Sequence, residues 1–361
     1  MRDENLQGVT GRASTRSFPA ARLSVLDTVM VGSGTTTTAA LEATITLAQR
    51  AEALGFARYW MAEHHGVPGV ASSAPVVMVG ALAAATRQIH VGSGGVMMTN
   101  HIPLIVAEQF NTLAALYPGR IDLGLGRASP EPRTAAVLGR SLANYGAEMF
   151  AKQVEDLCGF TRSDFPAGHP YAGVFVSPRP EQPPAIWILG TSLEAASLAG
   201  RLGLPFAFAH HFGRASAAPA LERYRTSFRP SAKREKPYAV VTALVACAPT
   251  DDEADDIARS ADLMFRRLFQ GRPGRLPSLV EVKAHSWTRE DLAFIEQRRQ
   301  GQAVGSPDTV RLALVRLLES TGADELMMTT QMFSLADRIR SLELVSAMVA
   351  PTGARLPEAV A

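Results

Sequence analysis

Short apolar runs alternate with amphipathic stretches of helical periodicity along most of the chain. The first pair is an apolar run over residues 22–27 and, after a loop rich in Gly and Thr, a helical pattern over 39–54 that ends at Gly55. The predicted buried face of that helix consists of Leu41, Ile45, Ala48 and Leu54. Runs this short, separated by helices, are typical of buried parallel strands joined by right-handed crossovers.

The same rhythm continues to the end of the chain. Further strands are predicted at 57–62, 89–96, 120–125, 185–189, 205–209, 238–247 and 325–330. Helices are predicted at 74–86, 103–117, 147–160, 192–202, 215–228, 251–268, 309–321 and 335–349. Two stretches interrupt the rhythm and are predicted as insertions, one near 161–184 and one at 270–305, before Ser306 as a helix cap and Pro307 as the first helical residue.

About eight strands alternating with about eight helices predict a (β/α)8 TIM barrel with insertions. A doubly wound open sheet is the alternative. It is disfavoured because Gly124 and Gly126, the close-spaced glycines that follow a strand, lack the third glycine and the acidic residue about 20 positions further on that a dinucleotide-binding turn needs.

Composition limits the domain organisation and the partners. Of 361 residues, 47% are hydrophobic, enough for a large core, and we expect one barrel domain over 22–350, a loosely attached extension over 1–21 and a tail over 351–361. The net charge of +2 gives no reason to expect a nucleic acid or an anionic membrane as partner. No apolar run approaches the ~20 residues of a membrane span. The two cysteines, Cys158 and Cys247, form neither a disulfide framework nor a thiolate metal site, so the reducing cytoplasm is the expected location.

Polar residues gather where the predicted strands end, which is where a barrel of this kind carries its site. These ends contain Leu26, Asp27, Glu63, His64, His65, Gly94, Gly95, Arg127, Gly190, Thr191, Ser192, His210, His211 and Gln331. Arg127 follows two glycines spaced by one residue, so a permanent cation emerges where the backbone carries little bulk. Such a place suits an anion, above all a phosphate.

Four motifs carry a resemblance to a known family. The runs YWMAEHHGVPG, VGSGGVMMTNH, PGRIDLGLGRA and WILGTSLEAASLAGRLGLPFAFAHHF follow one another in the order found in the bacterial luciferase-like, flavin-dependent monooxygenases, and the likeness spans about 22–348. The resemblance implies a (β/α)8 barrel that takes up reduced FMN as a diffusible substrate and uses it with O2.

The resemblance also implies roles for single residues. Arg127 matches the arginine that holds the FMN phosphate, and Ser192, next to Gly190 and Thr191, matches a phosphate-binding hydroxyl at the start of a helix. Gly94 and Gly95 match the small residues behind the flavin ring, which a non-prolyl cis peptide joins in relatives. The remaining matches are His64 to the active-site histidine, a group that can move protons near neutral pH, and Asn100 with His101 to the family's Asn-His pair. Departures occur at Met98-Thr99, at residues 129–132 and at Thr191.

Simpler interpretations stand beside these. Arg127 could form a structural ion pair, and His64 and His65 could be interior histidines; since adjacent strand residues point to opposite faces, at most one of the two lines a pocket. No metal site is predicted, because no zinc-binding His pattern is present. Asp122 lies within a predicted strand and is expected to be a buried structural acid. The predicted substrate pocket contains Leu26, His65, Met97, His211 and Gln331.

The combined expectation is a two-component monooxygenase. Reduced FMN would come from a separate NAD(P)H-dependent flavin reductase, and oxygen would go to a small apolar organic substrate such as an aldehyde or an aromatic polyketide. A deazaflavin (F420)-dependent oxidoreductase and a non-catalytic flavin-binding barrel are the alternatives. The resemblance implies a homodimer.

Overall fold

The computed structural model describes residues 18–127, 132–139, 146–212, 216–231 and 234–349. The predicted tail over 351–361 and most of the predicted N-terminal extension lie outside these residues. None of the helices in the described ranges is long and apolar enough to cross a membrane. Cys158 and Cys247 are both free and buried, and burial raises the pKa of each thiol to about 11.

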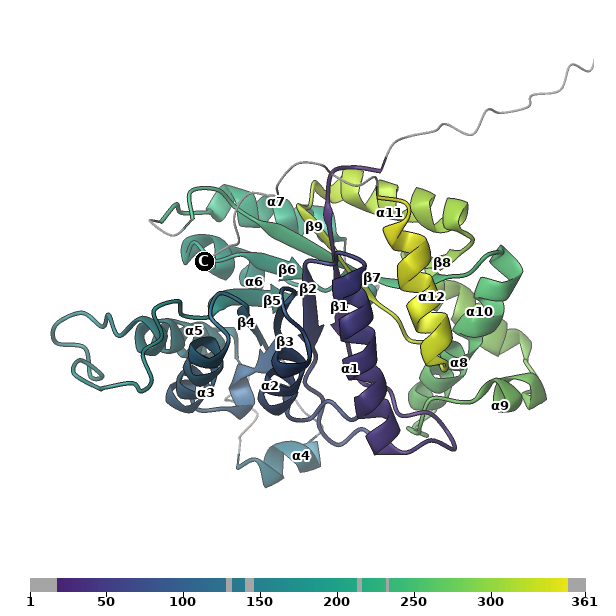
Figure 1. Ribbon diagram of the computed structural model, residues 1–361, viewed down its shortest axis with the longest axis horizontal. Helices are drawn as coiled ribbons and strands as arrows, with labels where there is room; N and C mark the ends of the chain where they lie inside the picture. Colours follow the sequence, from purple (N-terminus) through teal and green to yellow (C-terminus); the bar gives the residue numbers. More distant parts are fainter. Residues whose placement is uncertain (1–17, 128–131, 140–145, 213–215, 232–233, 350–361) are drawn as a thin grey trace, which may run out of the picture.

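Within the described residues, eight parallel strands close into a barrel with helices around it (Figure 1). The barrel strands are β1 (Arg22–Asp27), β2 (Arg58–Met61), β3 (His90–Met97), β4 (Ile121–Gly126), β5 (Ala185–Gly190), β6 (Phe206–Phe208), β7 (Ala239–Cys247) and β9 (Glu325–Thr329). The order is β6-β5-β4-β3-β2-β1-β9-β7, and pairing of β6 with β7 closes the ring. The predicted (β/α)8 barrel is therefore confirmed, and the open-sheet alternative is wrong.

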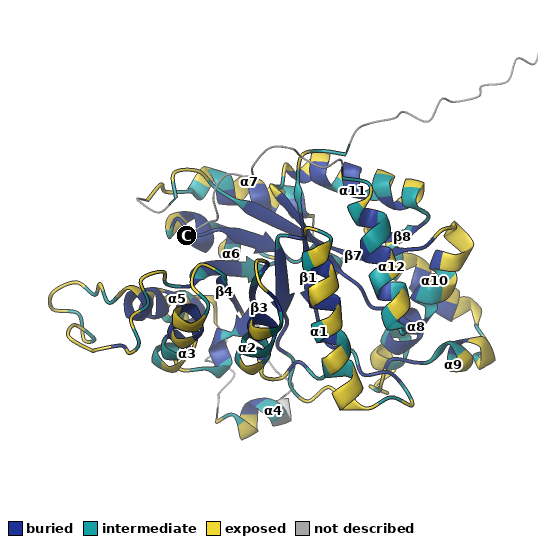
Figure 2. Ribbon diagram, viewed as in Figure 1, coloured by how far each residue is buried: buried dark blue, intermediate teal, exposed yellow. Residues whose placement is uncertain are grey.

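The helices present one buried and one exposed face (Figure 2). They are α1 (Thr37–Ala53), α2 (Pro75–Ala85), α3 (Pro103–Leu116), α5 (Ala147–Arg162), α6 (Leu193–Arg201), α7 (Ala217–Ser227), α11 (Pro307–Thr321) and α12 (Leu335–Ser346). A short helix that the sequence pattern did not predict, α4 (Pro132–Val137), follows β4.

The predicted buried face of α1 is confirmed in part: Ala48 is fully buried and the other three residues pack against the core, but the deepest burial lies on a neighbouring stripe of the helix. Leu41, Ile45 and Leu54 are only half-buried, and the fully buried residues are Thr44, Leu47, Ala48 and Ala51. The physical reason is a polar contact: the Thr44 hydroxyl donates a hydrogen bond of 2.8 Å to the Asp27 carboxylate, which anchors this face of the helix against β1. A search for apolar residues alone could not detect such an anchor.

The first predicted insertion contains neither helix nor strand after α5, but the second has elements of its own. It holds α9 (Leu279–Ala284), α10 (Arg289–Arg299) and the short strand β8 (Ala303–Gly305), which pairs with the end of β7. With α8 (Asp251–Phe269) these helices gather on one side of the barrel (Figure 1). Leu276 of the insertion exchanges backbone hydrogen bonds with Val31 and Ser33 after β1, so the insertion reaches the carboxyl ends of the strands.

The barrel interior is polar near the strand starts and apolar above. Arg58 is buried and donates to Asp122 at 2.9 Å and to Glu325 at 3.1 Å, while its guanidinium stacks 4.5 Å from the Trp187 ring. The expectation that Asp122 is a buried structural acid is confirmed. Above this network lies an apolar layer formed by Leu26, Trp60, Ala62, Trp187, Ala207, Val240 and Met327.

Candidate active site

Residues predicted for the site lie at the carboxyl ends of neighbouring strands. Sheet order places the ends of β1, β2 and β3 side by side, and the ends of β4, β5 and β6 next to them. One group of residues is organised around Glu63 and a cluster of imidazoles. A second group lies around Arg127.

Glu63 connects three segments at this end of the barrel through hydrogen bonds that we call the Glu63 clamp. Its Oε1 accepts hydrogen bonds from His65 Nε2 at 2.7 Å and from His101 Nε2 at 2.9 Å, and its Oε2 accepts one from the Met97 backbone N–H at 3.0 Å. Burial alone would raise the pKa of this carboxyl, but the bonds from His101, His65 and Met97 outweigh it and hold the pKa below its usual value. The sequence pattern located Glu63 but indicated no role for it.

We expect Glu63→Gln to lower the free energy of unfolding by about 1–3 kcal/mol. The amide nitrogen of Gln would face one of the N–H donors that the carboxylate now accepts from, so a buried donor would lose its partner. Urea unfolding of the purified variant measures the change. Glu42→Gln, an exposed glutamate on α1, is the control and should leave stability unchanged; equal stability of the two variants would contradict the clamp.

His64 faces away from this clamp. Its backbone N–H donates to Ser72 O at 3.0 Å, and its ring Nδ1 is buried with no hydrogen-bond partner among the described residues. Burial lowers the pKa of His64, which keeps the ring neutral at neutral pH. His65 is bonded to Glu63 and His64 is not, but both follow the end of β2 at Met61, so the alternation expected for strand residues does not apply to them.

Two more imidazoles follow β6 on the short 3-10 helix η3 (His210–Phe212). His211 Nδ1 lies 2.6 Å from the Thr242 hydroxyl of β7. Burial, together with the nearby rings of His64 and His210, lowers the pKa of His211 to about 4. His64 and His211 therefore lie close enough for their charges to interact, and both are neutral at pH 7.

Gly94 and Gly95 lie where larger residues do not fit. A Cβ on Gly94 would come within 2.6 Å of Leu26 Cδ1, and one on Gly95 within 2.7 Å of the Gly124 carbonyl oxygen. The peptide bond between them is cis, which confirms what the resemblance implies. Leu26, predicted for the substrate pocket, lies in the apolar layer beneath Gly94. The predicted pocket residue Met97 packs beside Gly126. A Cβ added to Gly126 would lie 3.3 Å from the methyl carbon of Met97.

Arg127 and Ser192 form a corner at the ends of the adjacent strands β4 and β5. Arg127 is exposed, and Ser192 is the N-cap of α6, with its hydroxyl accepting the Ala195 N–H at 3.2 Å. Glu194, in the first turn of α6, has a pKa below its usual value because its own backbone N–H, Ser192 and the Arg127 charge stabilise the carboxylate. The corner therefore combines a guanidinium with a helix N-terminus, the two groups that bind phosphate in proteins. Thr191 is exposed and Gly190 half-buried at its edge.

Other residues at the strand ends have different surroundings. Asp27 points away from the barrel end and bonds Arg338 at 2.8 Å, so it joins β1 to α12 and belongs to the fold. Gln331 accepts from Arg298 of α10 at 3.4 Å, which connects the end of β9 to the second insertion. Asn100 ends the 3-10 helix η1 (Met98–Asn100), directly before His101.

Glu63, His65 and His101 are the described residues whose ligand atoms come close enough for a metal ion, within 4.8 Å of one another. The hydrogen bonds of 2.7 Å and 2.9 Å between them account for this proximity without an ion. The Arg127 corner and the imidazole cluster instead fit an anionic organic cofactor: one supplies groups for a phosphate, and the other a buried ring nitrogen, His64 Nδ1, that has no hydrogen-bond partner among the described residues.

Comparison with known proteins agrees with this geometry. The family model described as luciferase-like monooxygenase matches residues 22–325. A luciferase-like monooxygenase of Escherichia coli K12 is 40% identical over 89% of this chain and 95% of its own length. The N-acetyl-S-alkylcysteine monooxygenase of Bacillus subtilis is 33% identical over 90% of this chain and 97% of its own length. The crystal structure of apo-MsnO8 has a TM-score of 0.81 and 36% identity, covering 91% of this chain and 97% of that one.

More distant structures share the fold. An FMN complex of the oxygenating constituent of 3,6-diketocamphane monooxygenase has a TM-score of 0.67 at 20% identity, and an F420-dependent secondary alcohol dehydrogenase has 0.65 at 18%. At such identities the likeness shows the fold alone. The family match and the closer relatives go further: the chain belongs to the luciferase-like monooxygenase family.

Proposed function

We propose that this oxidoreductase is a two-component monooxygenase that uses reduced FMN. The observation that carries the proposal is the pairing of Arg127 with the N-terminus of α6 at the ends of adjacent strands, beside a cluster of neutral imidazoles. FMN fits these residues because its phosphate carries the charge that the corner can neutralise.

Reduced FMN, when bound, supplies the electrons for splitting O2, with one oxygen atom transferred to the substrate and the other released as water. The chain's own residues bind, orient and move protons. Arg127 and the first turn of α6 hold the phosphate, and the flat ring lies beside Gly94 and Gly95, above the apolar layer. His64, neutral and with its Nδ1 unoccupied among the described residues, holds or accepts a proton at that atom.

A separate NAD(P)H-dependent reductase is the proposed source of reduced FMN, because the sequence carries no nicotinamide-binding fingerprint of its own. The substrate is proposed to be a small apolar organic molecule over the ring. Met97 supplies apolar surface, while His65 and His211 supply polar edges. Leu26, beneath Gly94, supports the ring from below. The Bacillus relative, which is named for a thioether substrate, extends the candidate class beyond aldehydes and polyketides.

A deazaflavin-dependent hydride transfer is the second candidate, since an F420-dependent enzyme shares the fold. The deazaflavin cofactor also carries a phosphate, so binding at the Arg127 corner does not distinguish the two candidate functions. Oxygen consumption distinguishes them, because the monooxygenase needs O2 and the deazaflavin enzyme does not.

The binding experiment compares FMN with riboflavin, which lacks the phosphate. We expect the protein to prefer FMN, and Arg127→Ala to weaken FMN binding about 10- to 100-fold by removing a charge-assisted hydrogen bond. Fluorescence titration of the flavins measures both affinities. Arg201→Ala, an exposed arginine in the last turn of α6, is the matched control and should retain the preference. If Arg127→Ala also retained it, the phosphate assignment would be wrong.

Glu194 places a carboxylate next to the proposed phosphate. We expect Glu194→Gln to tighten FMN binding about two- to fivefold, the effect of one charge in the first turn of a helix. The same titration measures the change at low ionic strength, where such effects are largest. Unchanged or weaker binding would place the phosphate elsewhere.

The proposed homodimer finds support in apolar side chains on the early helices. Val77 of α2 and Leu116 of α3 are exposed to 67% and 65%, and Ile102 and Ile105, at the start of α3, are also exposed. A surface of this kind is suited to burial against a second copy. Light scattering that shows only monomer at micromolar concentration would contradict the dimer.

A further inference from the structure

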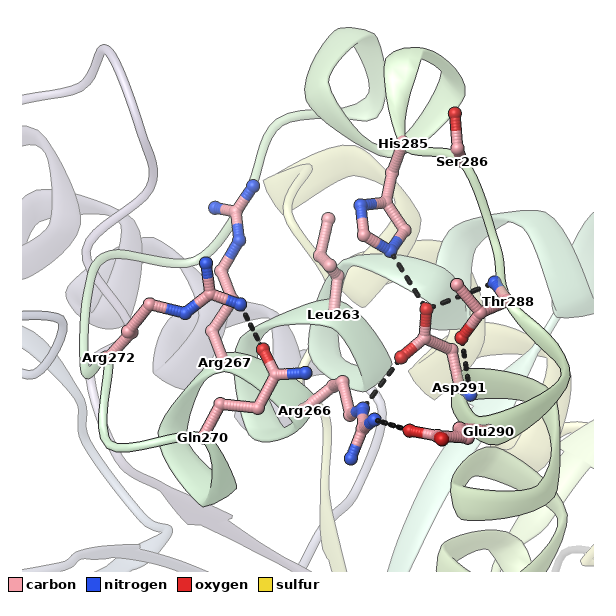
Figure 3. A pocket seen from close by; sticks show the side chains of 10 residues that line it. All are labelled: Leu263, Arg266, Arg267, Gln270, Arg272, His285, Ser286, Thr288, Glu290 and Asp291. Atoms are coloured by element: carbon pink, nitrogen blue, oxygen red, sulfur yellow. Dashed lines mark hydrogen bonds and ion pairs between the residues drawn. The ribbon is translucent and has the colours of Figure 1, made fainter.

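The second insertion contains a cavity that none of the candidate site residues lines. Its volume is about 360 Å³, and it lies between the end of α8, residues 270–272 and the segment 285–291 that leads into α10. Figure 3 shows Arg267 and Arg272 on one side, His285 and Asp291 on the other, and Leu263 between them. A cavity of this size can hold a small organic molecule.

The acidic groups that line the cavity are already engaged. Asp291 is buried and accepts from Arg266 Nε at 2.6 Å and from the Thr288 N–H at 3.1 Å. Glu290, at the exposed rim, accepts from the same guanidinium at 3.3 Å. Arg266 therefore neutralises the acids of this wall through its Nε and Nη2 donors.

Two guanidinium groups of the cavity lack a close carboxylate acceptor among the described residues. Arg272 bonds the neutral Gln270 side chain, and no carboxylate of the described residues lies within ion-pair distance of it. Arg267 lies 3.6 Å from Glu281, longer than a charge-assisted hydrogen bond. His285 Nε2 lies 3.4 Å from the Asp291 carboxylate and is paired with it (Figure 3). The lining thus keeps one guanidinium, that of Arg272, with no carboxylate partner among the described residues.

We propose that this cavity binds a small organic molecule through a phosphate-type oxyanion, with Arg272 and Arg267 as its cationic ligands. Guanidinium groups present paired N–H donors that match the oxygens of such an anion, and Leu263 offers an apolar surface for the organic part. The site is independent of the proposed flavin chemistry.

The position of the cavity gives its occupant a structural consequence. Arg275 and Leu276, which follow the loop of Arg272, bond Thr35 and Ser33 in the loop after β1. Glu281, the partner of Arg267, is the N3 residue of α9 and completes the capping box with Ser278. An oxyanion at Arg267 and Arg272 would therefore hold together the part of the insertion that reaches the barrel end.

Trp287 provides a reporter for the test. Its ring lies 4.7 Å from the His285 ring, edge to face, whereas Trp60 and Trp187 are buried inside the barrel. We would titrate inorganic pyrophosphate at constant ionic strength and follow tryptophan emission. We expect a saturable change in the wild type and in Arg127→Ala, because the flavin corner is not involved, and loss of the change in Trp287→Phe.

The ligand arginines are tested by Arg272→Ala and by the double variant Arg267→Ala/Arg272→Ala. We expect at least a tenfold loss of pyrophosphate affinity in the double variant. The single variant Arg272→Ala should also lose affinity, and because Arg272 is exposed, the fold should tolerate this change. Arg223→Ala, an exposed arginine on α7, is the matched control and should bind as the wild type does. A response that never saturates, that chloride reproduces, that disappears in Arg127→Ala or that is equal in the double variant would overturn the proposal.

Discussion

Replacing His64 by Ala is expected to lower the rate of substrate oxygenation about 10²- to 10⁴-fold, the usual contribution of a positioned proton-transfer group. FMN affinity should change little, because the phosphate corner around Arg127 and Ser192 is formed by other strands. The physical reason for the loss is the buried Nδ1 of His64, which has no hydrogen-bond partner among the described residues and is the atom placed to hold a proton.

The measurement is oxygen uptake and product formation with excess reduced FMN and a reductase to regenerate it. His169→Ala is a matched control, because His169 stacks on Phe165 in the first insertion and lies outside the site. Collapse of flavin binding in His64→Ala, with turnover per bound flavin intact, would make the histidine structural and would contradict its catalytic role.

The pH dependence of turnover provides a second test of the role of His64. Burial lowers the pKa of His64, so the neutral ring persists to lower pH than an ordinary imidazole, whose pKa is about 6.5. If the neutral form is the active one, the acid limb of the wild-type profile should lie below that value. A limb above it would assign the titration to another group.

Arg58→Met is expected to lower the free energy of unfolding by about 3–5 kcal/mol, because it leaves Asp122 and Glu325 as uncompensated buried charges. Arg58, Asp122 and Glu325 have side chains that are at most 1% exposed, and a charge removed from water needs its partner. Chemical denaturation measures the change. Replacing the partners together with apolar residues of similar volume should recover much of the loss, since the cost is in the unpaired charge.

Arg50→Ala is the matched control for Arg58. Arg50 also forms an ion pair, 2.6 Å from Glu343, but its side chain is 42% exposed, so we expect a loss of only about 0–1 kcal/mol. Equal losses at the two positions would contradict the assignment of the barrel network to stability.

The network also sets the direction of a pH effect. Burial raises the pKa of Asp122, but Arg58, His90 and Trp60 outweigh it and hold the pKa well below its ordinary value of 3.8. A carboxyl with a lowered pKa stabilises the fold above its unfolded-state pKa and loses that contribution as pH falls toward the folded-state pKa. The stability of the wild type should therefore decline as pH falls below about 4, and the contribution from this network should be absent in Arg58→Met.

The sequence predicted the barrel because each strand is short, apolar and followed by a helix. It also located the strand ends, because each apolar run stops at polar or small residues: Glu63-His64-His65, Gly94-Gly95 and Arg127. The most deeply buried stripe of α1 and the strand β8 were not predicted, for physical reasons. Thr44 is buried by a hydrogen bond to Asp27, and β8 has only three residues.

Contacts between distant segments could not be predicted from local patterns. The clamp joins Glu63 to His101, 38 positions away, and the Arg58 network joins β2 to β4 and β9. Asp27 appeared among the strand-end residues, but its side chain points to α12, because the orientation of the last residue of a strand is set by its partner, Arg338. The resemblance supplied residue roles that periodicity alone could not, and those roles remain predictions for the variants above.

The central claim, that the protein binds reduced FMN and directs its reaction with O2, is tested most directly by stopped-flow absorbance. Anaerobic protein with photoreduced FMN is mixed with oxygenated buffer, and reoxidation of the flavin is followed. The account predicts a slow phase whose amplitude rises with protein concentration until all flavin is bound, and whose appearance in Arg127→Ala requires more protein. Reoxidation identical to that of free flavin in buffer at every protein concentration would contradict the claim and favour the deazaflavin alternative.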